Sequence, residues 1–109
     1  MNLARKIRTL QFIQDKIEAA NFYLLDLEWL ATKLECLTIF HKDRVAKLKR
    51  AEDVLEGCQE GCNCPISVAE RACREEFGSV MLDEYYALEK RYQSVCRRLR
   101  AAISLKPVA

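Results

Sequence analysis

Apolar residues recur at spacings of three and four along the first half of the chain, with polar residues between them. One heptad set is Leu3, Leu10, Ile17, Leu24, Ala31, Thr38 and Val45. The other set, in the same heptads, is Ile13, Ala20, Leu27, Leu34, His41, Leu48 and Leu55. Because such positions share one face of an α-helix, the pattern predicts a single long helix over residues 3–56.

A short segment, residues 57–65, interrupts this pattern. It holds two of the three glycines, three of the six cysteines and one of the two prolines. A glycine suits the end of the first helix, and Pro65 suits the first position of the next one. Beyond the segment, a second apolar seam predicts a helix over residues 66–104. The seam is Met81, Tyr85, Leu88, Tyr92, Val95, Leu99 and Ala102.

Two long helices joined by a short elbow are expected to pack as antiparallel neighbours. We therefore predict an all-α protein, one domain over residues 1–109, built as an antiparallel two-helix coiled-coil hairpin. A second copy of the hairpin would complete a four-helix bundle. The alternative is a break near Asp43, where Thr38 and His41 place a polar layer in the seam. A further alternative is a kink that folds the N-terminal part of the first helix back to make a three- or four-helix bundle within one chain.

The charges along the two predicted helices favour the hairpin. Residues 18–36 carry a net charge of −3, and residues 86–104, which the hairpin places beside them, carry +4. Residues 37–56 carry +1, and their partners 66–85 carry −3. Surface ion pairs contribute little to stability individually, but they help to select orientation and register. The opposite signs in both halves therefore agree with antiparallel packing.

Two groups of apolar residues on the first helix would stay uncovered in this hairpin. The first helix extends beyond the second by about 22 Å at 1.5 Å per residue. This overhang contains Leu3, Ile7, Leu10 and Ile13. A second stripe comprises Phe22, Leu25, Trp29, Cys36, Ile39 and Phe40. Since large exposed apolar patches mark partner surfaces, we expect a non-catalytic protein–protein interaction module, an adaptor, chaperone or small subunit that binds a protein partner or forms a homodimer.

The cysteines indicate an alternative function, a thiol-based metal-binding or redox-switch module. The four thiolates that a structural zinc site needs could come from Cys58, Cys62, Cys64 and Cys73. Their spacing lacks the paired Cys-x-x-Cys knuckles of many zinc sites, so no cofactor is expected. Within the elbow, Cys58 and Cys64 are the best placed to form a disulfide. Otherwise the thiols stay reduced, and the helical cysteines serve as small packing residues. These are Cys36, Cys73 and Cys96.

Residue types suited to catalysis are sparse. The only histidine is His41, and it lacks the glutamate three residues earlier that a di-iron Glu-x-x-His motif requires. It also has no cysteine four residues away on the same helix face. The chain has no glycine-rich phosphate loop. The sequence therefore predicts a protein that is not an enzyme.

Charge and composition bear on nucleic-acid binding, membrane insertion and cellular location. The net charge of +2 provides no overall field that would favour nucleic acid. The most apolar run, residues 21–31, contains two acidic residues and is too short to span a bilayer. We therefore expect a cytoplasmic protein. The alternative is a mitochondrial one, because no acidic residue precedes Asp15 and an arginine-bearing, acid-free start resembles a presequence.

Overall fold

The computed structural model describes residues 2–37, 41–58, 62–76, 78 and 82–104. These residues form helices and no strand, so the predicted all-α class is confirmed. The four described helices are α1 (Leu3–Cys36), α2 (His41–Gly57), α3 (Pro65–Glu76) and α4 (Leu82–Ser104).

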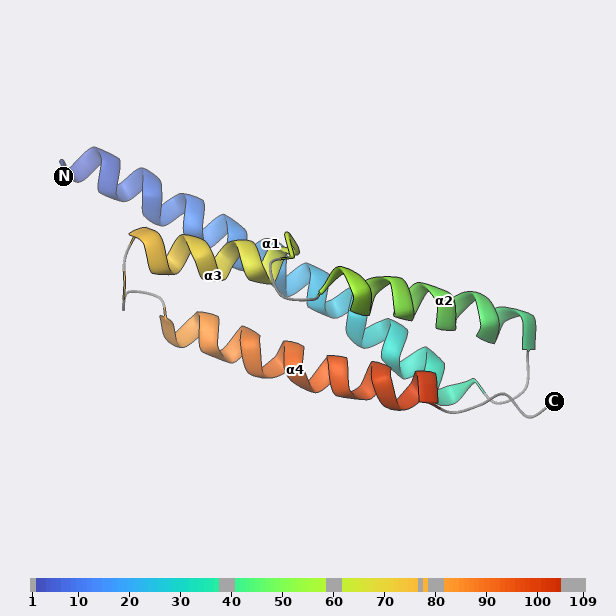
Figure 1. The fold of residues 1–109 in the computed structure, drawn as a ribbon. Helices are drawn as coiled ribbons and strands as arrows, with labels where there is room; N and C mark the ends of the chain where they lie inside the picture. The colour runs from blue at the N-terminus through green and yellow to red at the C-terminus, as the bar shows by residue number, and fades with distance from the viewer. Residues whose placement is uncertain (1, 38–40, 59–61, 77, 79–81, 105–109) are drawn as a thin grey trace.

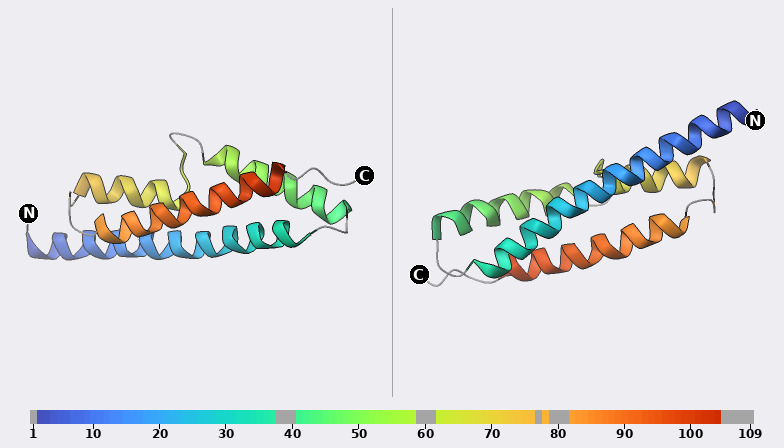
Figure 2. Two further views of the ribbon diagram at one scale, coloured as in Figure 1. Left: turned by 90° about the horizontal axis from the view of Figure 1, so that it is seen from below. Right: turned by 180° about the vertical axis from the view of Figure 1, so that it is seen from behind.

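The helices lie in three rows along an elongated molecule of 63 × 21 × 19 Å (Figure 1). The first row is α1 alone. In the second row, α2 lies beside the C-terminal half of α1 and α3 beside its N-terminal half (Figure 2). The third row is α4, which packs against all the other helices. Among the described helices, none is long and apolar enough to cross a bilayer.

The chain reverses between α1 and α2 and again between α3 and α4, but not at the cysteine-rich segment (Figure 1). Residue numbers rise along the second row while those of the neighbours on α1 fall. The pairs are Lys47 with Trp29, Cys58 with Tyr23, and Val68 with Phe12 across one cavity. The second row is therefore antiparallel to α1 throughout. Segment 57–65 interrupts a row and does not form the elbow of a two-helix hairpin.

The first predicted helix is in fact two helices. It ends at Cys36, and Leu37 leaves the helical conformation with φ −85° and ψ 100°. The next residues, 38–40, lie outside the described ranges, and their sequence consists of β-branched and aromatic types with lower helix propensity. A new helix begins at His41, with Asp43 in the first turn, where a carboxylate interacts favourably with the helix dipole. The predicted alternative, a break near this polar layer, is the one that occurs.

The second predicted helix is also interrupted. Its first part ends at Glu76, and Gly78 has φ +58°, a left-handed conformation that glycine adopts without Cβ strain. The next helix begins at Leu82, with Asp83 and Glu84 in its first turn. Gly78 is the only glycine beyond the cysteine-rich segment, so the sequence carried the signal for this second reversal.

The heptad pattern located the core face of α1. Its seam from Ile13 to Leu34 is buried as predicted, with Leu30 added. The buried residues of this helix are Ile13, Ile17, Ala20, Leu24, Leu27, Leu30, Ala31 and Leu34. On α4 the buried residues are Tyr85, Leu88, Val95, Cys96, Leu99 and Ala102. Except for Cys96, these residues form one continuous apolar core with the buried residues of α3 and with Ala51 of α2.

Two ion pairs show that α1 and α4 run in the same direction. Arg91 donates to Glu28, and the Nε of Arg98 donates to Glu35 over 2.9 Å. Both pairs join residues 63 positions apart. A constant difference in residue number requires parallel helices, because antiparallel helices keep the sum constant. The two oppositely charged blocks therefore do meet, but in the orientation opposite to the predicted one.

Burial is much poorer on α2 than on the other helices. Its buried residues are Arg44 and Ala51. Leu48 and Leu55 are partly buried against the core, whereas Val45 is exposed. The predicted seam is therefore only partly covered on this helix, because α2 lies over one end of the α1–α4 pair.

Candidate thiol centre

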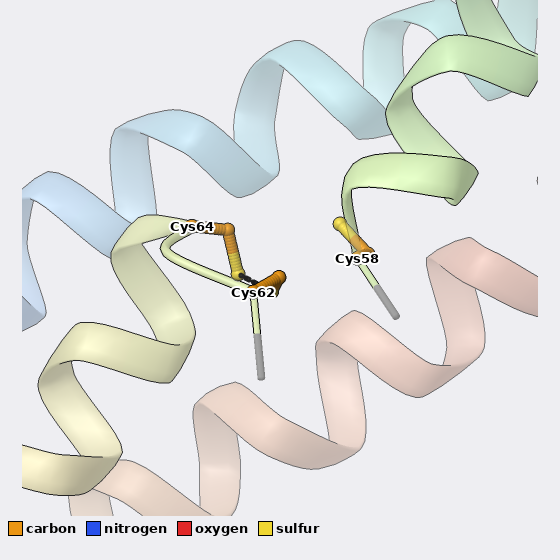
Figure 3. A group of neighbouring side chains, drawn as sticks. All are labelled: Cys58, Cys62 and Cys64. Atoms are coloured by element: carbon orange, nitrogen blue, oxygen red, sulfur yellow. Dashed lines mark hydrogen bonds between the residues drawn. The ribbon is translucent and has the colours of Figure 1, made fainter. Parts of the chain in front are cut away.

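Three cysteine thiols converge where α2 ends and α3 begins. The Sγ atoms of Cys58, Cys62 and Cys64 all lie within 4.8 Å of one another. The Sγ atoms of Cys62 and Cys64 approach to 3.3 Å. Figure 3 shows the three side chains gathered in the gap between the two helix ends. We call this group the thiol centre. The structure thus brings together three of the four cysteines that the sequence nominated as metal ligands.

The helix ends position the thiol centre. The Cys58 N–H donates to the carbonyl of Leu55 over 3.2 Å, which holds this residue against the last turn of α2. Pro65 is the first residue of α3, as its fixed φ and missing N–H favour. The Val68 N–H donates to the Cys64 carbonyl over 3.0 Å, so that Cys64 is held at the start of α3. Backbone hydrogen bonds therefore hold two of the three cysteines, Cys58 and Cys64, at helix ends.

Ser67 connects two thiols of the centre and helps to set their ionisation. Its Oγ lies 3.1 Å from the Cys62 Sγ and 3.3 Å from the Cys64 Sγ. Burial tends to raise the pKa of Cys62, but hydrogen bonds with Ser67 and Cys64 and the charge of Arg71 outweigh burial and lower it. Burial, together with the neighbouring thiols, raises the pKa of Cys64. Cys62 is therefore the more readily ionised member of this pair.

Tyr23 joins the thiol centre to α1. Its hydroxyl lies 3.5 Å from the Cys58 Sγ. Burial, followed by the hydrogen bond with Cys58, raises the pKa of Tyr23. The phenol therefore keeps its proton and can donate a hydrogen bond to a Cys58 thiolate. Sequence reasoning did not include Tyr23 or Ser67 in the site, because only the packing of α1 against the second row brings Tyr23 to Cys58.

Cys73 does not belong to the thiol centre. It is fully buried on the core face of α3, and burial and the charge of Glu84 raise its pKa. The predicted four-thiol set is therefore incomplete, because α3 carries Cys73 along its axis away from the helix start. Cys58 and Cys64, the predicted disulfide partners, are free thiols, as are the other four cysteines.

The remaining helical cysteines differ from each other. Cys96 is buried on α4, as expected for a packing residue. Cys36 is exposed at the C-terminal end of α1, so it does not pack in the core of the described residues.

The predicted partner surface on α1 is partly inside the core. Ile13 is 0% exposed, because α3 and α4 extend far enough to cover it. The uncovered overhang of α1 is therefore about one helical turn shorter than predicted. Leu3 and Ile7 are exposed, and Leu10 is partly buried. Ile39 and Phe40 lie outside the described residues.

The second predicted stripe has four exposed members, Cys36 and three large apolar residues that we call the α1 strip. Phe22, Leu25 and Trp29 are 64%, 52% and 53% exposed. Lysines flank one end of the strip. Lys33 and Lys47 lie over the Trp29 ring, with Nζ to centroid distances of 5.8 and 5.7 Å. Lys47 belongs to α2, so this end of the strip also touches the second row.

Comparison of the chain with protein-family models, with curated proteins and with solved structures gave no match.

Proposed function

We propose that this protein is a helical module that binds a soft metal ion at the thiol centre, and that this ion is zinc. The observation that carries the proposal is the convergence of three free thiols to within 4.8 Å. Zinc–sulfur bonds of about 2.3 Å place tetrahedral sulfur ligands a little under 4 Å apart. Small side-chain movements would therefore bring all three thiols into ligand positions.

The residues around the thiols favour soft ions over hard ones. The group contains sulfur and no carboxylate or imidazole. Thiolates select zinc, copper(I) and iron–sulfur clusters, whereas calcium and magnesium need oxygen ligands. Each thiol releases its proton when it becomes a ligand. The lowered pKa of Cys62 makes this step easier at neutral pH.

Metal binding would tie α2 to α3. Cys58 follows the last turn of α2, whereas Cys62 and Cys64 precede α3. An ion held by all three would close the gap between two helices that lie in one row. Its role in this arrangement would be structural, because it would join the two helices of the second row.

The test is a titration of the reduced, full-length chain with zinc and cobalt(II). We expect one ion per chain and, with cobalt, the intense sulfur-to-metal charge-transfer absorption of thiolate ligands. Cys62→Ser should reduce the affinity by about tenfold or more. Cys36→Ser is the matched control, because Cys36 is an exposed thiol on α1. A wild-type chain that stays folded and binds no soft metal ion would disprove the proposal.

A second candidate function is self-association through the α1 strip. The observation that favours it is the exposure of three large apolar residues on the outward face of one helix. Phe22 and Trp29 lie equally far from the centre of the strip, and so do Glu18 and Lys33. Two antiparallel copies would therefore pair Phe22 with Trp29 and Glu18 with Lys33 across a two-fold axis.

Sedimentation velocity at several concentrations tests this second candidate. We expect a dimer for the wild-type chain and a monomer for Phe22→Glu combined with Trp29→Glu, with helicity unchanged. Tyr86→Glu on α4 is the control, since Tyr86 is 51% exposed and lies outside the strip. A wild-type monomer over the whole concentration range would contradict self-association.

A further inference from the structure

Helix α4, the third row, borders the thiol centre at a groove beside Cys58. Cys58 and Cys96 line the same groove, which has a volume of about 320 Å³. The residues that line it are Leu55, Cys58, Tyr92, Gln93, Cys96, Arg97 and Arg100. All of them except Leu55 and Cys58 belong to α4. A fourth thiol, on a different helix, therefore lies on the groove that Cys58 lines, next to the three thiols that lie within 4.8 Å of one another.

Tyr92 marks the region between these two thiols. Its hydroxyl oxygen is buried and has no hydrogen-bond partner of normal geometry among the described residues. Tyr92 and Cys96 are four residues apart on α4 and therefore share one helix face. A buried phenol without a partner is costly unless an acceptor such as a thiolate forms beside it.

The geometry points to Cys96 on α4 as the fourth thiolate of a tetrahedral zinc site whose other ligands are Cys58, Cys62 and Cys64. This inference rests on the metal binding proposed above. It replaces Cys73, the fourth candidate from the sequence. Cys73 is buried on the core face of α3 and is not among the residues that line the groove of Cys58 and Cys96. The Tyr92 hydroxyl then donates to a ligand thiolate.

Charge on α4 supports a four-thiolate site. Zinc with four thiolates carries a net charge of −2, because each of the four thiols loses one proton. Arg97 and Arg100 line the groove beside Cys58 and Cys96 and offset this charge. A zinc ion in this position would connect all of the second row to α4.

The experiment compares Cys96→Ser with Cys73→Ser in the reduced, full-length chain, since both cysteines are buried and lie on helices. With cobalt(II), the wild-type charge-transfer intensity should correspond to four sulfur ligands. Cys96→Ser should lose about a quarter of it. Cys96→Ser should also bind zinc about tenfold or more weakly, whereas Cys73→Ser should match the wild type in both measurements. Far-UV circular dichroism without metal checks that each variant is folded.

The outcomes separate the inference from the proposed function. A wild-type chain that binds zinc, with Cys96→Ser giving the same spectrum and affinity, leaves a three-thiolate site and overturns the inference alone. A wild-type chain that binds no zinc overturns both. If Cys96→Ser does not fold, X-ray absorption of the zinc-loaded wild type decides. Four sulfur neighbours support the inference, and three sulfurs with a light atom contradict it.

Discussion

The two halves of the second row, α2 and α3, differ in how they are held. The shorter helix, α3, has twelve residues and buries four of them, Ile66, Ala69, Ala72 and Cys73. The longer helix, α2, has seventeen residues and buries Arg44 and Ala51. Helix α3 is therefore fixed by apolar packing in the core. Helix α2 depends more on contacts at its edges, such as Lys47 over Trp29.

This difference explains the position of the thiol centre. It lies at the junction between a well-packed helix and a poorly packed one. Apolar burial contributes about 25 cal/mol per Å², so a helix with few buried residues gains little from packing. A metal ion at the junction would compensate by attaching α2 to the better-held α3.

Truncating a buried side chain should cost far more on α3 than on α2. Ile66→Ala should destabilise the protein by about 2–5 kcal/mol, because it opens a cavity in the core. Leu48→Ala, at a partly buried site on α2, should cost about 1 kcal/mol or less. Urea denaturation followed by circular dichroism measures both. Equal costs would mean that α2 is packed as firmly as α3.

Zinc should protect α2 more than α3. Binding at one hundred times the dissociation constant stabilises the bound form by about 2.7 kcal/mol. Hydrogen–deuterium exchange with and without zinc should show the larger slowing in α2, whose amides open most readily in the metal-free chain. Cys62→Ser should abolish the difference. Uniform slowing in both helices would contradict the idea that the ion chiefly secures α2.

The two thiols on the α3 side should differ in reactivity. At pH 7–8, iodoacetamide should alkylate Cys62 several-fold faster than Cys64, because the thiolate reacts and the pKa is lowered at Cys62 and raised at Cys64. Mass spectrometry of peptides from briefly treated protein gives the rates. Ser67→Ala should slow the Cys62 reaction, since it removes a hydrogen bond that favours the thiolate. Equal rates in the wild type would show that Ser67 and Arg71 do not lower the pKa of Cys62.

The smallest effect is expected for the ion pair between α1 and α4. Removing the Arg98–Glu35 interaction should cost about 0.2–1 kcal/mol, because both side chains are more than one-third exposed. A double-mutant cycle with Arg98→Ala and Glu35→Ala gives the coupling energy. The exchanged pair, Arg98→Glu with Glu35→Arg, should recover most of this coupling energy if the two residues face each other as in the parallel register. A vanishing coupling energy would remove this evidence for the parallel pair.

Much of the helical content could be predicted from the sequence. The heptad spacing identified the core face of α1 from Ile13 to Leu34, and Pro65 marked the start of α3. The two chain reversals were harder to place, because the heptad positions run on through Thr38 and His41, and the second reversal is marked by a single glycine, Gly78. Local propensity is weak compared with tertiary packing, so a periodic pattern does not show where a helix stops.

The charge pattern gave the right neighbours and the wrong direction. The acidic block of α1 does pair with the basic block of α4, through Glu28 with Arg91 and Glu35 with Arg98. Net charge per block carries no direction along a helix. Only the spacing of individual pairs, which share one offset, distinguishes parallel from antiparallel packing.

By itself, the sequence determined the helical class, the buried face of α1 and the presence of three cysteines between two helices. The tertiary structure alone decided that this segment lies inside a row of helices, that Tyr23 reaches Cys58, and that Cys73 points elsewhere. The reason is physical. Spacing along the chain fixes which residues share a helix face, whereas the neighbours of that face depend on where the chain reverses. Because the chain reverses before α2 and after α3, Cys58, Cys62 and Cys64 lie between two helices of one row and not at a hairpin turn.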